Sequence, residues 1–238
     1  MLNIKDYTPK ILTVDGNIGS GKSTFIQNFK QYINNYIKNI NIIFVQEPID
    51  EWNNITDKNG DNILSNFYKD QEKYAFSFQI MAIITRYKKL TEAINEAYTL
   101  ELKTNKKTFI VVERSIITDK HIFAKMLYNS NKIDEINYKI YCKWYDIIEP
   151  SISIYKMLYI YTLPNICHER INNRNRSGEE EININYLNSC NEYHDIMIDT
   201  MEKKGISIYK INCNNNNLYD NIENTYNFFN KIYEDIFN

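Results

Sequence analysis

A glycine-rich segment near the start of the chain has the composition and spacing of a phosphate-binding loop. Residues 16–23 read Gly-Asn-Ile-Gly-Ser-Gly-Lys-Ser and fit the pattern G-x-x-x-x-G-K-[ST]. Glycines let the backbone turn successive N–H groups toward an anion, and the N-terminus of a following helix adds more of them. Lys22 supplies a mobile cation for the β- and γ-phosphates, and the Ser23 hydroxyl suits Mg²⁺. The loop predicts nucleotide binding and leaves the reaction open.

Acidic residues follow two of the predicted strands. Glu47 comes directly after the segment 41–46, and Glu113 comes directly after the segment 108–112. Because ligands bind at the carboxyl ends of parallel strands, both side chains are expected in the same crevice as the phosphate loop. There Glu113 can position Mg²⁺, and Glu47 can accept a proton from an attacking hydroxyl. Trp52, a few residues beyond Glu47, is expected to wall this pocket.

The elements that position these side chains alternate between short apolar segments and longer helical patterns. The predicted strands cover residues 10–15, 41–46, 108–112, 157–161 and 206–211. The predicted helices cover residues 23–37, 72–101, 118–128, 135–147, 165–174, 184–203 and 218–236. This alternation predicts an α/β fold with three layers, in which helices flank a five-stranded parallel sheet. Neither a repeat nor a Pro/Gly/Ser linker interrupts it, so residues 1–238 are expected to form a single domain.

Composition excludes several classes of protein. The chain has 238 residues, and 43% of them are hydrophobic, which supports a sizeable core and argues against intrinsic disorder. The formal net charge is −2, so no global basic field exists and a nucleic-acid partner is disfavoured. No apolar run is long enough to cross a bilayer, so no membrane partner is expected. The four cysteines form no C-x-x-C pair and are expected to be reduced thiols in the cytoplasm.

Two short motifs imitate those of a small GTPase. Residues 57–60 fit D-x-x-G, and residues 131–134 fit N-K-x-D. In a GTPase both motifs should follow buried apolar strands, whereas here the first follows a polar segment and the second follows a segment with helical spacing. We therefore interpret both as surface turns and keep a GTPase-like nucleotide-binding switch only as a less favoured alternative.

Taken in order, the motifs resemble those of the deoxynucleoside kinase family, which includes deoxycytidine, deoxyguanosine, deoxyadenosine and mitochondrial-type thymidine kinases. The resemblance covers about residues 10–200. It rests on residues 16–23, Glu47-Pro48 with Trp52, residues 76–79, Glu113-Arg114-Ser115 with Asp119 and Phe123, and the segment 170–181. It implies a P-loop kinase fold with an Arg-rich lid at about residues 174–181, which transfers the γ-phosphoryl group of ATP to the 5′-hydroxyl of a deoxynucleoside. It also implies a homodimer.

The resemblance further implies roles for individual residues. Glu47 corresponds to the general base, Arg114 to the residue that orients it, and Glu113 with Ser23 to the magnesium-positioning pair. Lys22, Arg174 and Arg176 would stabilise the transferred phosphoryl group, and Glu179 would contact the sugar 3′-hydroxyl. The residues expected to bind ATP are Gly16, Asn17, Ile18, Gly19, Ser20, Gly21, Lys22, Ser23 and Thr24, together with Arg170, Arg174 and Arg176.

A stripe on the predicted helix 72–101 is expected to read the base. Gln79, Ala82 and Arg86 have the spacing i, i+3 and i+7, and glutamine can both donate and accept a hydrogen bond at a base edge. By resemblance, Arg86 and Asp119 match the pair found in the cytosine and purine kinases. We therefore expect deoxyadenosine, deoxyguanosine or deoxycytidine to be preferred over thymidine. Tyr68 and Phe123 either contact the nucleoside or belong to the core.

A thymidylate-type nucleoside-monophosphate kinase is the second interpretation, since such enzymes share the P-loop and an arginine lid. Their acceptor already carries a phosphate, so they need extra cationic contacts beside it. The carboxylate of Glu47 at that position disfavours this alternative.

Overall fold

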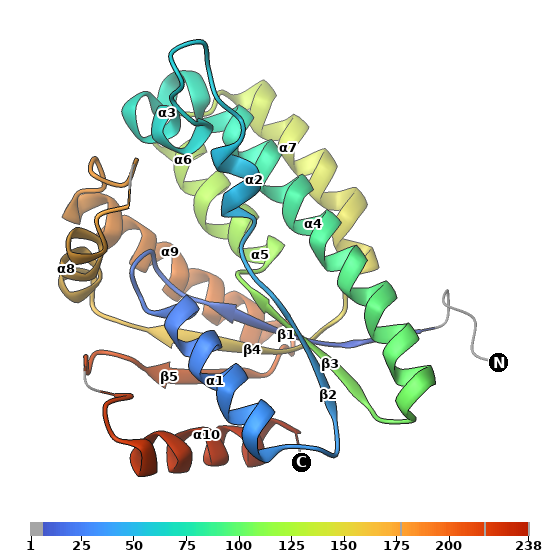
Figure 1. Cartoon of the computed structure of the whole chain (residues 1–238). Coiled ribbons are helices and arrows are strands. Elements are labelled where there is room, and N and C mark those ends of the chain that lie inside the picture. Colours follow the sequence, from blue (N-terminus) through green and yellow to red (C-terminus); the bar gives the residue numbers. More distant parts are fainter. Residues whose placement is uncertain (1–6, 177, 217, 238) are drawn as a thin grey trace.

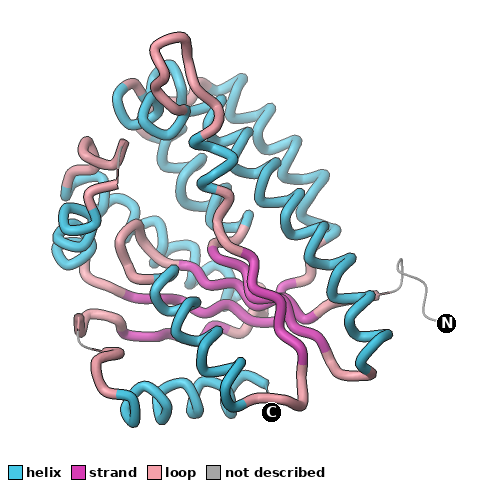
Figure 2. The backbone as a smooth tube through the Cα atoms, in the orientation of Figure 1, coloured by secondary structure: helices cyan, strands magenta, loops and turns pink. Residues whose placement is uncertain are grey.

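A five-stranded, all-parallel sheet forms the centre of the computed structural model, which describes residues 7–176, 178–216 and 218–237 (Figures 1 and 2). Its strands are β1 (Lys10–Asp15), β2 (Asn41–Val45), β3 (Thr108–Glu113), β4 (Ile154–Tyr161) and β5 (Ile208–Asn212). Their order is β2-β3-β1-β4-β5, so β1 is central: the chain passes from β1 to the edge strand β2, returns to β3 beside β1, and then crosses to β4 and β5 on the other side. The predicted α/β fold with a parallel sheet is therefore confirmed, and a crevice is expected at the carboxyl end of β1.

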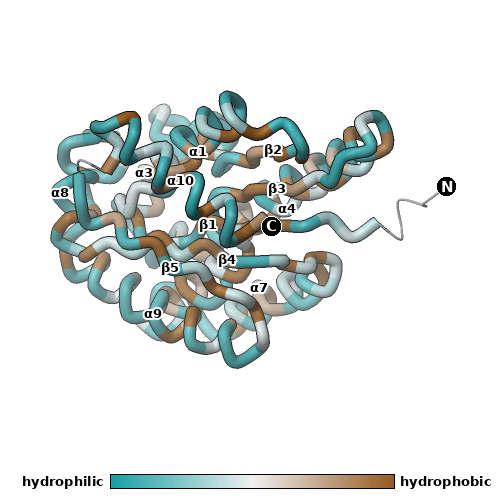
Figure 3. The backbone as a smooth tube through the Cα atoms, turned by 90° about the horizontal axis from the view of Figure 1, so that it is seen from below, coloured by the Kyte–Doolittle hydropathy of each residue, from teal (hydrophilic) through white to brown (hydrophobic). Residues whose placement is uncertain are grey.

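Alternating residues of the strands build a separate core on each face of the sheet. Leu12 and Val14 of β1 pack with Phe25 and Phe29 of α1 (Lys22–Tyr36) and with α10 (Ile222–Phe237). On the opposite face, Ile11 of β1 packs against α4 (Gln71–Thr104), while α9 (Ile184–Lys203) covers β4. Hydrophobic residues accordingly concentrate along the strands, as Figure 3 shows. The three predicted layers follow from this arrangement.

Most of the remaining helices lie toward the carboxyl ends of the strands, whereas the 3₁₀-helix η3 (Glu149–Ser151) leads into the start of β4. The others are α2 (Ile49–Asn53), α3 (Ile63–Lys69), α5 (Ile116–Thr118), the π-helix η2 (Asp119–Ala124), α6 (Lys125–Asn129), α7 (Glu135–Ile148) and α8 (Pro164–Arg174). Helices α2 and α3 were not predicted, and α2 with its five residues is too short to show a clear period. The predicted helix 118–128 consists of α5, η2 and α6 in succession, and the last helix begins at Ile222 rather than at residue 218.

The two GTPase-like motifs are turns, as predicted. Residues 57–60 form a turn closed by the bridge between Thr56 and Asn62, and Asn131 lies in an exposed turn after α6. Neither motif follows a strand. Within the described residues, none of the helices has both the length and the apolar character needed to span a bilayer.

Candidate active site

The phosphate-binding loop connects β1 to α1 and points its lysine into the crevice. Gly19 has a φ of 75°, and a Cβ there would lie 2.5 Å from the Cys167 carbonyl oxygen, so the position requires glycine. Lys22 Nζ donates hydrogen bonds to the carbonyl oxygens of Gly16 (3.0 Å) and Asn17 (2.7 Å). Burial and the charge of Arg114 lower the pKa of Lys22 to about 7. A bound polyphosphate would replace this unfavourable environment with negative charge.

The remaining loop residues divide between the cavity and the protein interior. Gly19, Ser20, Gly21, Ser23 and Thr24 line an open cavity of about 1030 Å³ together with Lys22. Ile18 lines the neighbouring pocket. Asn17 instead turns inward, because its Nδ2 donates to the Leu187 carbonyl oxygen of α9 at 2.9 Å and its Oδ1 accepts from the Ile18 N–H at 2.8 Å. The Asn17 side chain thus anchors the loop to α9, on the side away from the cavity.

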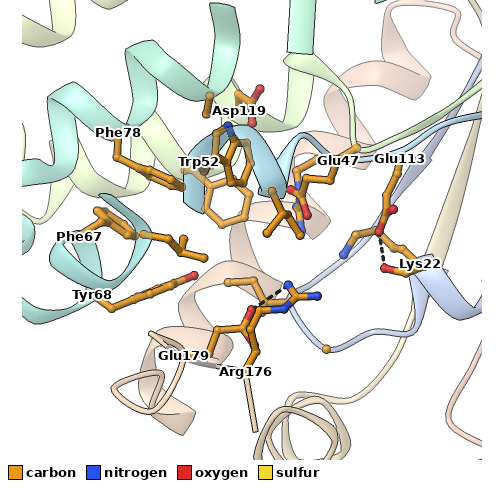
Figure 4. Close-up of a pocket in the computed structure, with 18 of the residues that line it drawn as sticks. Lys22, Glu47, Trp52, Phe67, Tyr68, Phe78, Glu113, Asp119, Arg176 and Glu179 are labelled. Atoms are coloured by element: carbon orange, nitrogen blue, oxygen red, sulfur yellow. Dashed lines mark hydrogen bonds and ion pairs between the residues drawn. The ribbon is translucent and has the colours of Figure 1, made fainter. Parts of the chain in front are cut away.

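A hydroxyl and a carboxylate meet at the N-terminus of α1. The Ser23 Oγ donates a hydrogen bond to Glu113 Oε1 at 2.5 Å, and Glu113 ends β3 (Figure 4). Within the part of the chain that the structure describes, no group of three or more His, Cys, Asp and Glu side chains could hold a metal ion. The pair nevertheless fits Mg²⁺, which commonly takes one or two protein oxygens and completes its coordination with phosphates and water.

Glu47 lies in the same pocket as Lys22, as predicted from the strand ends (Figure 4). Its Oε1 accepts hydrogen bonds from two buried arginines, Arg86 through Nη2 and Arg114 through Nε, the latter at 3.3 Å. Burial alone would raise the pKa of Glu47, but the charges of Arg86, Arg114 and Lys22 outweigh burial and hold this pKa well below its usual range. Glu47 is therefore ionised at any physiological pH.

A second compartment of this pocket is lined by aromatic rings. Figure 4 shows Trp52, Phe67 and Phe78 on one side of the cavity and Tyr68 below them. The rings pack on one another, with 4.7 Å between the centroids of Phe67 and Phe78. The whole pocket spans about 700 Å³, including space that is open to solvent. Phe123 also lines it and lies beneath the Arg114 guanidinium at 4.8 Å.

The predicted base-reading stripe faces this compartment. Gln79, Ala82 and Arg86 of α4 all line it, and the buried Oε1 of Gln79 has no hydrogen-bond partner in the described structure. Arg86 Nε lies 3.0 Å from Asp119 Oδ2, so the predicted pair is formed. Asp119 begins the π-helix, a widened turn that often marks functional sites. Burial raises the pKa of Asp119 to about 6 despite the opposing charge of Arg86.

The arginines of the predicted lid lie between the two cavities. Arg174 and Arg176 line both of them, and each pairs with Glu179, at 2.5 Å and 3.2 Å respectively. Arg170 faces only the loop-side cavity, where its Nη2 donates to the Cys213 carbonyl oxygen at 2.7 Å. Within the lid, Ser177 falls outside the described residues.

Several pocket residues were missed by sequence reasoning. They are Ile49, Leu64, Phe67, Phe78 and Tyr186. The apolar spacing of residues 63, 64, 67 and 68 is a helical signal that would have revealed α3. The contact of Arg86 with Glu47 had no signal, because it joins residues 39 positions apart on different elements.

Comparison with known proteins identifies the family. Residues 12–238 match the family described as deoxynucleoside kinase. The chain is 30% identical over 237 residues to a probable deoxycytidine kinase of Fowlpox virus (strain NVSL), covering 95% of this chain and 91% of that protein. It is 30% identical over 202 residues to deoxycytidine kinase of Homo sapiens (78% and 74% covered) and 26% identical over 205 residues to mitochondrial deoxyguanosine kinase of Xenopus laevis (80% and 74% covered). With its P-loop, its parallel sheet and this match, the chain belongs to the deoxynucleoside kinase family.

Proposed function

We propose that this kinase transfers the γ-phosphoryl group of ATP to the 5′-hydroxyl of a deoxynucleoside and yields the 5′-monophosphate. The observation that carries the proposal is the position of Glu47, an ionised carboxylate between the aromatic compartment and Lys22 of the phosphate loop. A nucleoside whose base occupies the aromatic compartment would extend its sugar toward this carboxylate. The ATP phosphates would lie on the loop side, where the second cavity begins.

Glu47 is expected to orient the hydroxyl more than to pull its proton away early. A carboxylate with so low a pKa is a weak base. Phosphoryl transfer has a loose transition state, and positioning and charge neutralisation supply most of the catalysis. We infer that Glu47 accepts a hydrogen bond from the 5′-hydroxyl and takes its proton once the new O–P bond has begun to form. Arg114 holds the carboxylate in place through its Nε.

The cations around the loop are suited to the charge that develops on the transferred group. Lys22 lies at the junction of both cavities, and Arg174 and Arg176 approach from the lid. Magnesium, when bound by Ser23 and Glu113, would neutralise charge on the phosphate oxygens. Glu179 currently pairs with both lid arginines, and a sugar 3′-hydroxyl would compete for it. Arginines released in this way could then turn toward the phosphates.

The base compartment favours deoxyadenosine, deoxyguanosine or deoxycytidine over thymidine. Arg86 and Asp119 place a donor and an acceptor side by side, and the free Oε1 of Gln79 adds a second acceptor. This set complements an amino group next to a ring nitrogen, whereas thymine offers a carbonyl and a methyl group. The relatives named deoxycytidine and deoxyguanosine kinases support the same choice.

We also infer that the chain forms one kinase domain over residues 1–238 and assembles as a homodimer. The support for the dimer is a row of apolar side chains on α7, with spacing i, i+4, i+8 and i+11. They are Ile136, Ile140, Trp144 and Ile147, and they are 72%, 43%, 45% and 71% exposed. An exposed apolar face of this kind marks an interaction surface.

A phosphorylation panel tests the proposed reaction. Purified protein with ATP and Mg²⁺ is assayed on the four deoxynucleosides and on thymidine monophosphate, for the wild type and for Glu47→Gln. Turnover of deoxynucleosides, and its loss in a folded Glu47→Gln variant, is expected. Preferred turnover of thymidine monophosphate would instead favour a monophosphate kinase, and thymidine as the best substrate would reject the predicted base choice.

A further inference from the structure

Asp15 is a buried carboxylate that the proposed reaction does not use. It ends β1, is completely buried and lines neither of the two cavities. Its Oδ1 accepts hydrogen bonds from the Ser115 N–H at 2.9 Å, from the Ser115 hydroxyl at 3.0 Å and from the Thr118 hydroxyl. Burial of a carboxylate is costly unless its partners are well placed. Three donors converging on one oxygen indicate that Asp15 holds the segment after β3 in a defined position.

Arg114 is the first residue of this segment, and its backbone is strained. Arg114 has a φ of 64°, whereas the other non-glycine residues with positive φ in the described chain are all asparagines. A bulky side chain keeps such a conformation only where its surroundings enforce it. The Arg114 N–H donates to the Val14 carbonyl oxygen at 3.0 Å, and the next N–H donates to Asp15. The last two residues of β1 therefore fix the peptide groups on both sides of Arg114.

This backbone conformation determines where the Arg114 side chain reaches. Its Nε lies 3.3 Å from Glu47 Oε1, and its Nη1 donates to the Gly16 carbonyl oxygen at 3.3 Å. If Ser115 moved away from Asp15, Arg114 could relax to a negative φ and its guanidinium would leave Glu47. We propose that Asp15 is a positioning residue, which sets Arg114 and through it Glu47. The inference rests on the proposed function, because it assigns Asp15 to the reaction that Glu47 serves.

Two variants of Asp15 and one control test this inference. Asp15→Ala removes the acceptor, and kcat is expected to fall on the order of 10²-fold, with KM for either substrate changed by less than about threefold. Asp15→Asn restores an oxygen acceptor and should recover most of kcat. The control Thr13→Val lies on the same strand and is equally buried, but its hydroxyl has no partner in the described structure, so kcat should stay at the wild-type value. Equal losses in Asp15→Ala and Asp15→Asn would overturn the inference.

A double-mutant cycle separates positioning from general structural damage. In an Arg114→Ala background, Asp15→Ala should lower kcat by less than about threefold further, because the residue through which it acts is gone. Additive losses would overturn the inference. If Asp15→Ala does not fold, Ser115→Ala/Thr118→Val decides instead, since it removes two of the three donors and leaves Asp15 in place. A kcat within about threefold of wild type in that variant would also overturn it.

The assay distinguishes failure of this inference from failure of the proposed function. Wild type and Glu47→Gln are measured first on the deoxynucleoside panel. Absence of wild-type turnover would reject the proposed function. Wild-type turnover that is lost in Glu47→Gln but retained in folded Asp15→Ala would reject only the role of Asp15.

Discussion

Replacing Arg86 with leucine is expected to leave Asp119 as an unpaired buried charge. The side chains of Arg86 and Asp119 are 5% and 2% exposed, and their ion pair spans 3.0 Å. Within the described residues, no other lysine or arginine lies within ion-pair distance of Asp119. Glu47 keeps an ion-pair partner in Arg86→Leu, because the Arg114 Nε lies 3.3 Å from its Oε1. The loss of stability in Arg86→Leu should therefore come mainly from Asp119.

The size of this loss follows from the burial of the pair. Removing one partner of a buried ion pair costs roughly 3–5 kcal/mol. For a chain of this length, each kcal/mol lowers Tm by about 2–4 °C, so Tm should fall by about 6–20 °C. The loss must depend on pH, because burial raises the pKa of Asp119 to about 6 even with Arg86 present. Without Arg86 this pKa rises further, so Asp119 is neutral at pH 5 and the destabilisation should be much smaller there than at pH 8.

Thermal unfolding of a double-mutant cycle at pH 5 and pH 8 measures the effect. In Arg86→Leu/Asp119→Ala no unpaired charge remains, so most of the Tm lost in Arg86→Leu at pH 8 should return. Lys88→Leu is the matched control, because Lys88 lies on the same helix and its pair with Glu51 is exposed and 3.8 Å long. Its Tm should change little. Additive losses in the double variant, or equal losses at both pH values, would refute the reasoning.

Three further predictions follow from the site and the α7 face. In Arg86→Leu the pKa of Glu47 rises, since burial is then offset only by Arg114 and Lys22. The acid limb of the kcat–pH profile of Arg86→Leu should therefore lie at higher pH than that of the wild type. Profiles of the two proteins that coincide from pH 4.5 to 8 would contradict this. Arg174→Ala should lower kcat by about 10²–10³-fold and alter nucleoside Kd, measured by calorimetry, far less; a loss seen mainly in Kd would contradict a transition-state role. Trp144→Asp should convert the expected dimer to a monomer in light scattering, whereas a monomeric wild type would reject the dimer.

The sheet could be predicted from sequence because each strand is a short apolar segment between longer helical patterns. The expected bounds of β1 agree with those of the structure, and β3 extends only one residue beyond the expected segment, to Glu113. The helices around the pocket were harder to predict from sequence. Helix α2 has five residues, which is less than two turns, so no period can be recognised. The π-helix lies inside the predicted helix 118–128, and its widened turn has no sequence signal of its own.

Site residues could be predicted where a reactive residue type belongs to a spaced motif or stands at the end of a predicted strand. Lys22 belongs to a spaced motif, and Glu47 and Glu113 follow strands whose ends converge. The positive φ of Arg114 and the donors around Asp15 had no comparable signal. Both depend on the register between β1 and β3, which pairs Val14 with Glu113 and sets the residues after each strand side by side. Register of this kind is set by the three-dimensional packing of the sheet, and local sequence does not state it.

In the proposed reaction, the position of Arg86 would link the choice of base to turnover. One guanidinium contacts Asp119 in the base compartment, Glu47 beside the phosphate loop and the Glu113 carbonyl oxygen, the last at 3.4 Å. In the proposed reaction, a base that draws Arg86 toward itself also moves the cation that holds Glu47. Substitutions made to change base preference at Arg86 should therefore alter kcat as well as KM, whereas substitutions at Gln79, whose buried Oε1 has no hydrogen-bond partner in the described structure, should act mainly through KM. In the proposed reaction, selectivity and rate are consequently coupled through one buried side chain, and a design that separates them would first have to give Glu47 a second ion-pair partner besides Arg114.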